Sequence, residues 1–243
     1  MKRLFAAIAA KYDRMNHIMS LGLDHRWRRI ALHGIDLSPD SNILDLACGT
    51  GDFTLELLKR YPSANITGVD ITPEMMAIAK KKLPEGNTVN FSAGDAQNLY
   101  FLKDGTFSLV VCAFGFRNFP DKAKTLSECH RILKPDGRLI VLELFRPERK
   151  LLGILVDTWL AAISSVFARD AKTEYRYLRK SVANTVSANE FSVMASHAGF
   201  SLCHMKFMLP AANCVVLQKS VSSRHSASPS RMQAGSASSQ NGT

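Results

Sequence analysis

The sequence predicts an α/β fold with a mostly parallel seven-stranded sheet that is covered by helices. Apolar, strand-like runs alternate with helical patterns from residue 42 onward, as in parallel sheets whose strands are joined by crossover helices. A glycine-containing turn joins the first run to the first of these helices. The last two runs have no helical pattern between them, which predicts a terminal antiparallel hairpin.

The expected strands are short and are separated by turn or helix signals. A helix should begin at Thr72-Pro-Glu, because Thr72 can cap it, Pro73 suits its first position and Glu74 complements its dipole. Lys134–Gly137 has the composition of a turn. The other expected helices are Phe53–Arg60, Lys122–Leu133 and Ser187–Ala198. The expected strands are Asn42–Leu46, Ile66–Val69, Thr88–Ser92, Phe107–Phe114, Arg138–Leu144, Phe200–Met208 and Cys214–Gln218.

Two segments lie outside this alternation. Residues 1–38 carry helical patterns and predict an N-terminal helical cap, and residues 145–185 predict an inserted helical lid. Insertions at the carboxyl ends of strands tend to cover the ligand crevice. Leu151–Phe167 is largely apolar, which fits either a core-packed helix or a surface that meets lipid. We expect one domain over residues 1–219 and a disordered Ser-rich tail over residues 220–243.

Composition limits the class of protein. The formal charge of +10 and pI near 9.5 suit nucleic acid, anionic lipid or an acidic substrate, unless the charge is dispersed. The tract Lys80–Lys82 is too short for a typical RNA-binding patch. The five cysteines form no C-x-x-C pair, which favours buried thiols in a reducing cytoplasm. We expect an amphipathic helix rather than a secretion signal at the N-terminus.

The most informative segment is the turn Asp45–Asp52, with the sequence DLACGTGD. Glycines let the backbone approach a ligand, and an acidic residue at the end of the second strand, here Asp70, can hold a ribose. A dinucleotide motif needs a third glycine where this chain has Thr54. The flanking carboxylates suit a cationic ligand better than a phosphate. The turn therefore favours S-adenosylmethionine over a dinucleotide, and a βαβ turn without a ligand is the plainer alternative.

The chain also carries the pattern of a known family. The sheet, the turn, Asp70 and Asp95-Ala96 together resemble class I S-adenosylmethionine-dependent methyltransferases, whose fold is Rossmann-like. Three further segments resemble the ubiquinone/menaquinone biosynthesis C-methyltransferase family over about Phe5–Lys219. They are Lys11-Tyr-Asp-Arg-Met-Asn16 with Ser20-x-Gly22 and Trp27-Arg28, Phe114-Gly-Phe-Arg-Asn118, and Tyr175-x-Tyr-Leu-x-x-Ser181.

The resemblance implies methylation of a ring carbon on a prenylated benzoquinol or naphthoquinol. We favour demethylmenaquinol because of its broad use across bacteria, which is not a property of these residues. Several family members have a hydroxyl residue in place of Ala113, and the segments Asn184–Val186 and Ala212–Leu217 also depart from the family pattern. The Ala113 departure could remove one hydrogen bond to the donor without abolishing binding. The two segment departures affect the identity of the quinol more than the chemistry. The residues expected to bind the donor are Asp45, Gly49, Thr50, Gly51, Asp70, Ile71, Asp95, Ala96 and Ala113.

Four residues are candidates for catalysis. Arg117 and Asn118 follow the fourth strand, and Arg117 could stabilise a developing quinolate oxygen, since its pKa makes it a poor base. Tyr12 and Asp13 would come from the N-terminal cap, where Tyr12 could orient Arg117 or the ring and Asp13 could accept a proton. The plainer alternatives are a packing tyrosine, a helix-capping aspartate and a surface salt bridge.

Other functions are kept open. The alternatives are a methyltransferase for another phenolic or polyketide ring, and an RNA-binding methyltransferase, although the segment after the fourth strand does not favour nucleic acid. The expected partner is a prenylated quinol, and both peripheral contact at the inner face of the membrane and a homodimer are left open. No spacing of His, Asp and Glu indicates a metal site, and methyl transfer from a sulfonium needs no metal.

Overall fold

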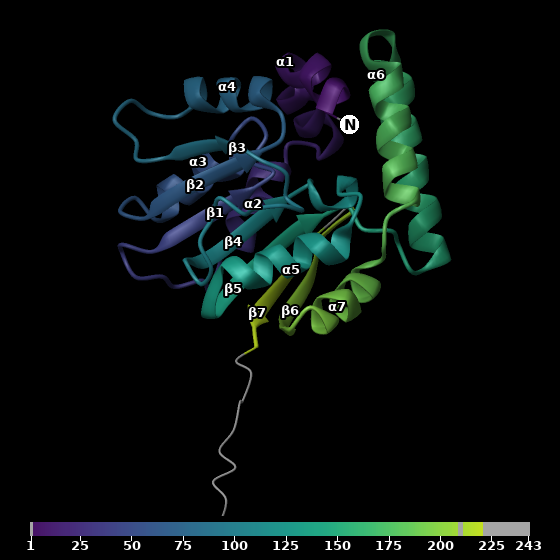
Figure 1. Ribbon diagram of the computed structural model, residues 1–243. Coiled ribbons are helices and arrows are strands. Elements are labelled where there is room, and N and C mark those ends of the chain that lie inside the picture. Colours follow the sequence, from purple (N-terminus) through teal and green to yellow (C-terminus); the bar gives the residue numbers. More distant parts are fainter. Residues whose placement is uncertain (1, 209–210, 221–243) are drawn as a thin grey trace, which may run out of the picture.

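The computed structural model describes residues 2–208 and 211–220. The seven strands form one sheet, and helices cover both of its faces (Figure 1). The expected tail from residue 220 lies outside the described residues, apart from Ser220 itself. The strands are β1 (Asn42–Leu46), β2 (Asn65–Asp70), β3 (Asn90–Ala93), β4 (Phe107–Ala113), β5 (Leu133–Glu143), β6 (Phe200–Met208) and β7 (Ala212–Lys219).

The strand order is β3-β2-β1-β4-β5-β7-β6. The first five strands pair in parallel, while β7 runs antiparallel to both β5 and β6. The predicted fold class is therefore confirmed. The predicted antiparallel hairpin is also confirmed. Its last strand, β7, inserts between β5 and β6 and leaves β6 at the edge of the sheet.

One local prediction was wrong. Lys134–Gly137 is not a turn before the fifth strand, because β5 already begins at Leu133 and runs through this segment. The turn-forming residues are accommodated as an irregularity, in which Asp136 takes a positive φ of 60° and the register against β4 shifts between Phe107 and Leu109. Asp and Gly tolerate such backbone angles, so the strand kinks there instead of ending.

Each face of the sheet has its own apolar core. On one face, α5 (Lys122–Ile132) and α7 (Ala188–His197) contribute Leu126 and Phe191. On the other face, α2 (Asp24–Ala31) and α3 (Asp52–Arg60) contribute Trp27 and Phe53. Because both faces are buried, β4 and the second half of β5 are almost entirely apolar.

The cap and the lid lie above the carboxyl ends of the strands (Figure 1). The cap is α1 (Lys2–Met19), which contacts α4 (Pro73–Lys82). The lid is α6 (Lys150–Ala183). Arg179 and Asp157 are 22 residues apart and form an ion pair, although a straight helix would separate them by about 33 Å. The two ends of α6 therefore lie side by side.

One side of α6 packs on residues that follow strands, and some described residues on it are exposed. Val156 and Val182 cluster with Ala211, which follows β6. Leu151, Ile154 and Leu155 are exposed. No helix among the described residues is long and apolar enough to cross a bilayer.

The cysteines are unpaired, as expected. Cys48, Cys112, Cys129 and Cys214 are buried, and Cys203 on β6 is exposed. Burial raises the pKa of the Cys129 and Cys214 thiols to about 12.

Candidate active site

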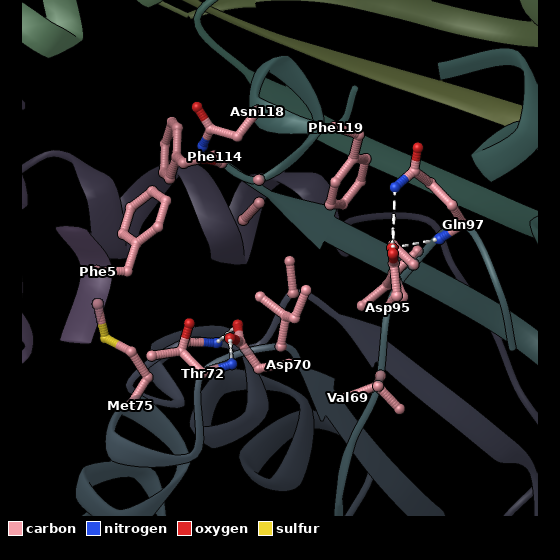
Figure 2. A pocket seen from close by; sticks show the side chains of 18 of the residues that line it. Phe5, Val69, Asp70, Thr72, Met75, Asp95, Gln97, Phe114, Asn118 and Phe119 are labelled. Atoms are coloured by element: carbon pink, nitrogen blue, oxygen red, sulfur yellow. Dashed lines mark hydrogen bonds between the residues drawn. The ribbon is translucent and has the colours of Figure 1, made fainter. Parts of the chain in front are cut away.

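A cavity of about 190 Å³ opens where the carboxyl ends of β1, β2 and β4 meet the cap. Its walls come from the turn after β1, the end of β2, the segments after β3 and β4, and Phe5 and Tyr12 of α1 (Figure 2). This is the edge at which open α/β sheets bind ligands. Six of the nine predicted donor residues line it: Gly49, Asp70, Ile71, Asp95, Ala96 and Ala113.

Asp70 organises the donor side of the cavity. Its two carboxylate oxygens accept the backbone N–H groups of Gly49, at 2.9 Å, and of Thr72, at 2.8 Å. Thr72 therefore donates its backbone N–H to Asp70, and its own side chain makes no capping hydrogen bond to α4. Burial raises the pKa of Asp70, and the backbone hydrogen bonds oppose that rise. Each carboxylate oxygen keeps a free lone pair that can accept a further hydroxyl.

Three predicted donor residues, Asp45, Thr50 and Gly51, lie behind this wall. Asp45 is buried and accepts the Thr54 hydroxyl at 2.6 Å. Thr54 stands where a dinucleotide motif has its third glycine, so its hydrogen bond replaces the close glycine contact between strand and helix. Burial raises the pKa of Asp45 to about 7. Asp45 thus supports the turn from within.

The stability of the protein should depend on the protonation of Asp45. An ordinary aspartate has a pKa near 3.9 in the unfolded chain, so the folded protein holds the Asp45 proton more tightly. This contribution is present at low pH and is lost as pH rises from about 4 to about 7, by up to about 1.4 kcal/mol per pH unit. Denaturant unfolding of wild type and Asp45→Asn across pH 4–8 measures it. Parallel stability profiles for the two proteins would contradict the assignment.

Gly51 is required by both its backbone angle and its neighbour. Its φ is +83°, and an added Cβ would lie 2.8 Å from the Ala79 Cβ on α4. Gly51→Ala should therefore lower the free energy of unfolding by about 2–4 kcal/mol, from left-handed strain and overpacking together. Gly34→Ala is the matched control, because Gly34 has a φ of +74° and open space around it. Equal losses in the two variants, measured by urea unfolding, would rule out the contact.

The segment after β3 closes the other end of the cavity. Asp95 accepts the backbone N–H of Gln97 at 2.9 Å and its side-chain amide at 3.1 Å, as Figure 2 shows. Phe119 and Val69 add apolar surface to the lining. Gln97 was not predicted from the sequence, although it directly follows the predicted pair Asp95-Ala96. This end offers a flat apolar surface beside polar groups, which suits a heteroaromatic base.

The four predicted catalytic residues divide into two pairs. Tyr12 and Asn118 line the cavity, whereas Arg117 and Asp13 do not. Asn118 accepts the Tyr177 hydroxyl at 2.7 Å, which joins the lid to the segment after β4. Phe5 makes edge contacts with Tyr12 and Tyr177, with ring centroids 6.0 and 6.4 Å apart. Cap and lid therefore meet over the cavity.

Arg117 is buried against a carboxylate that the sequence analysis missed. Its Nη1 donates to Glu143 Oε1 at 2.6 Å and to the Phe114 carbonyl at 2.7 Å, and its backbone N–H donates to Glu143 Oε2. The Arg117 side chain is 6% exposed and that of Glu143 is 0% exposed. Burial lowers the pKa of Arg117, but the charge and hydrogen bond of Glu143, together with Tyr12 and Tyr177, raise the pKa overall. The guanidinium is therefore a buried cation paired with Glu143. The alternative of a surface salt bridge is wrong.

Glu143 had a signal in the sequence. It is the acidic residue at the end of the apolar run Leu139–Leu142, at the edge of the sheet where the site lies. Tyr12 stands near the Arg117–Glu143 pair. Burial raises the pKa of the Tyr12 phenol, and the charge of Arg117 opposes this rise.

Asp13 belongs to an ionic network that joins the cap to the glycine turn. It accepts the Thr50 hydroxyl and lies 2.7 Å from Lys82 Nζ on α4. Lys82 also lies 2.6 Å from Asp52 in the first turn of α3. The Asp52 carboxylate already complements the amino end of α3. A phosphate would take this position in a dinucleotide site.

The sequence predicts no metal site, but three potential metal ligands lie close together where α1 leads into α2. His17, Asp24 and His25 lie with one potential ligand atom each within 4.8 Å of one another. Asp24 also accepts from Arg28 at 2.7 Å and from Ser20 at 3.0 Å. The buried guanidinium of Arg28, 2.7 Å from the Asp24 carboxylate, opposes binding of a metal cation at this cluster.

The lining fits a cationic donor. Among the described residues it contains the carboxylates of Asp70 and Asp95 and no lysine or arginine. Both Asp70 oxygens are aimed by backbone N–H groups, and the rest of the wall is largely apolar. A pyrophosphate would find no basic side chain here, whereas a sulfonium with a ribose and an adenine finds suitable groups.

The comparisons with known proteins agree with this geometry. The family model described as the ubiE/COQ5 methyltransferase family matches residues 1–215. A demethylmenaquinone methyltransferase of Thermotoga maritima is 40% identical over 206 residues, covering 82% of this chain and 87% of that protein. The ubiquinone/menaquinone biosynthesis C-methyltransferase UbiE of Citrifermentans bemidjiense is 35% identical over 207 residues, with coverages of 82% and 87%.

Solved structures support the fold. A possible histamine N-methyltransferase of Thermotoga maritima, described as S-adenosylmethionine-dependent, has a TM-score of 0.64 and 21% identity, and the match covers 90% of this chain and 100% of that chain. A Haloferax volcanii complex of a methyltransferase activator with a methyltransferase contains a chain with a TM-score of 0.66 and 18% identity, with coverages of 89% and 98%. At these identities the likeness shows a Rossmann-like methyltransferase fold.

Proposed function

Because the chain belongs to the ubiE/COQ5 methyltransferase family, we propose that it methylates a ring carbon of demethylmenaquinol, using S-adenosylmethionine as the donor. The observation that carries this proposal is the cavity at the carboxyl edge of the sheet, where Asp70 and Asp95 face an apolar wall without basic residues. The relative from Thermotoga maritima, named for demethylmenaquinone, supports the naphthoquinol over the benzoquinol ring.

The donor side follows from the residues that line the cavity. Asp70 would accept the ribose hydroxyls, and Asp95 and Ala96 would lie against the adenine between Ile71 and Phe119. Gly49 would let the backbone approach the amino-acid part. S-adenosylmethionine supplies an electrophilic methyl group on a sulfonium. Asp45, Thr50 and Gly51 hold the turn that carries these contacts, so their role in our proposal is to position the donor.

The acceptor side uses the second pair of residues. Tyr12 and Asn118 line the cavity and would orient the quinol ring by hydrogen bonds. Arg117 is held by Glu143, and its fixed positive charge would stabilise a ring hydroxyl as it loses its proton. A water carries that proton away, since an arginine is a poor base. Asp13, paired with Lys82 and Thr50, would keep the cap closed over the donor.

A prenylated quinol resides in the membrane, so the enzyme must reach a lipid surface. We propose peripheral contact at the inner face of the membrane. The exposed Leu151, Ile154 and Leu155 of the lid support it, because apolar helix faces of this kind bind the boundary between headgroups and acyl chains.

The test is a methylation assay under reducing conditions. The protein is incubated with labelled S-adenosylmethionine and either reduced demethylmenaquinone or the demethylated benzoquinol analogue, each with a short prenyl chain. Product from the naphthoquinol is the expected result, and product from the benzoquinol alone would reassign the ring. Product from neither, with donor binding intact, would overturn the proposed function.

A further inference from the structure

A strongly basic groove lies between α2 and the edge strand β6, outside the cavity described above. Its volume is about 660 Å³. Most side chains of β6 are exposed. The groove is lined by Ile30 and five basic side chains: Arg26, Arg29, His33, His204 and Lys206.

The protein does not neutralise this groove. All five basic side chains are exposed, and none lies within 4 Å of a carboxylate among the described residues. The neighbouring Arg28 behaves differently, because it is buried and paired with Asp24 at 2.7 Å. Clustered like charges repel each other, so an uncompensated groove of this kind attracts anions.

Secondary structure brings these charges together. Arg26 and Arg29 are three residues apart on α2 and share a face of the helix, and His33 follows shortly after its end. His204 and Lys206 are two residues apart on β6 and share a face of the strand. The two segments are far apart in the sequence, so the basic run His25–Arg29 alone does not indicate the groove.

Apolar surface adjoins the same edge of the sheet. Leu202 on β6 is 49% exposed. The lid packs against Ala211, just past the end of β6, and turns Leu151, Ile154 and Leu155 outward. No aromatic residue lines the groove, whereas proteins that bind single-stranded nucleic acid use aromatic side chains to stack the bases. Basic and apolar groups together are typical of surfaces that bind membranes.

We propose that the α2–β6 groove binds the phosphate groups of an anionic lipid surface, so that the β6 edge and the lid dock together on the membrane. The choice of a lipid rests on the proposed function, whose substrate is prenylated. The groove would supply the electrostatic attraction and the lid would insert its apolar side chains. The membrane would then lie against the lid, which meets the cap over the cavity.

The test is binding to vesicles in the absence of substrate. Full-length protein is sedimented with vesicles of 30% phosphatidylglycerol in phosphatidylcholine, and with phosphatidylcholine alone, at about 0.1 M salt. Arg26→Gln/Arg29→Gln removes two groove charges, and at about 1 kcal/mol for each charge near the surface its partition constant should fall about 30-fold. Lys103→Gln/Lys134→Gln is the matched control, because these exposed lysines precede β4 and begin β5 and do not line the groove. It should change binding less than threefold.

The outcomes are decisive. Equal losses of vesicle binding in the two double variants would overturn the proposal that the groove binds anionic lipid. Equal binding of the wild type to neutral and anionic vesicles would do the same. Preferential binding of a single-stranded RNA, or displacement from vesicles by millimolar inorganic phosphate at constant ionic strength, would assign the groove to another anion and overturn the lipid. Methylation of a short-chain quinol in solution should be unchanged in both variants. Its absence in the wild type would count against the proposed function and leave the vesicle result standing.

Discussion

Replacing Glu143 with alanine should lower the free energy of unfolding by about 3–5 kcal/mol. The variant leaves the Arg117 guanidinium buried without its carboxylate, and it also removes the acceptor for the backbone N–H groups of Arg117 and Leu144. An uncompensated buried charge is one of the few single changes with an effect of this size. Urea unfolding, with the midpoint and slope compared to wild type, measures it.

Two further variants separate charge from packing. Glu143→Gln keeps the shape and part of the hydrogen bonding, and should be less destabilised than Glu143→Ala. The double variant Arg117→Met/Glu143→Leu removes both charges, so it should recover much of the lost stability while methyl transfer stays low. If the double variant were as unstable as Glu143→Ala, the loss would come from packing and not from the unpaired charge.

The same reasoning changes what an Arg117 variant reports. Arg117→Ala should lower the single-turnover rate with little effect on donor binding, but it also leaves Glu143 buried and unpaired. The double variant is therefore the better test of catalysis, because it leaves neither buried charge without its partner. A single-turnover rate equal to that of wild type would show that the Arg117 charge has no catalytic role.

Replacing Asp70 with alanine should raise the dissociation constant for S-adenosylmethionine at least about 100-fold, since hydrogen bonds to a charged group contribute about 1.5–3 kcal/mol each. The variant loses the acceptor for the ribose and also the anchors for the Gly49 and Thr72 backbone N–H groups. Isothermal titration calorimetry measures the affinity, and thermal unfolding shows whether the variant remains folded.

Asp45→Asn is the control for Asp70→Ala. Asp45 is not part of the cavity lining and accepts the Thr54 hydroxyl. The asparagine oxygen can keep this hydrogen bond and so hold the turn, and the variant should therefore bind the donor within about threefold of wild type. A similar loss of affinity in the two variants would mean that the turn as a whole, and not the Asp70 carboxylate, determines donor binding.

The sheet and the donor side were predictable because their signals are local. The run Asn42–Leu46, the glycines after it and Asp70 each show their role within a few residues, and periodicity places them on neighbouring strands. Lys134–Gly137 shows the limit of local signals, because β5 runs through these turn residues as an irregularity between Leu133 and Arg138, which both pair with β4.

The acceptor side was harder because its contacts join distant segments. Arg117 meets Glu143 across neighbouring strands, and Asn118 meets Tyr177 of the lid. Asp13 was a candidate proton acceptor, and the sequence did not indicate that Lys82 and Thr50 lie beside it. Pairing of this kind depends on the tertiary fold, which spacing along the chain does not show. The basic groove depends in the same way on α2 and β6 lying side by side.

The distribution of thiols gives this protein a ready attachment point for a probe. Four of its five cysteines are buried, and burial raises the pKa of each of their thiols, so these groups stay protonated and shielded from reagents. Cys203 is exposed and directly precedes His204 of the α2–β6 groove. A maleimide dye should therefore label the native chain at one position. Its fluorescence would follow events at the β6 edge without any engineered cysteine.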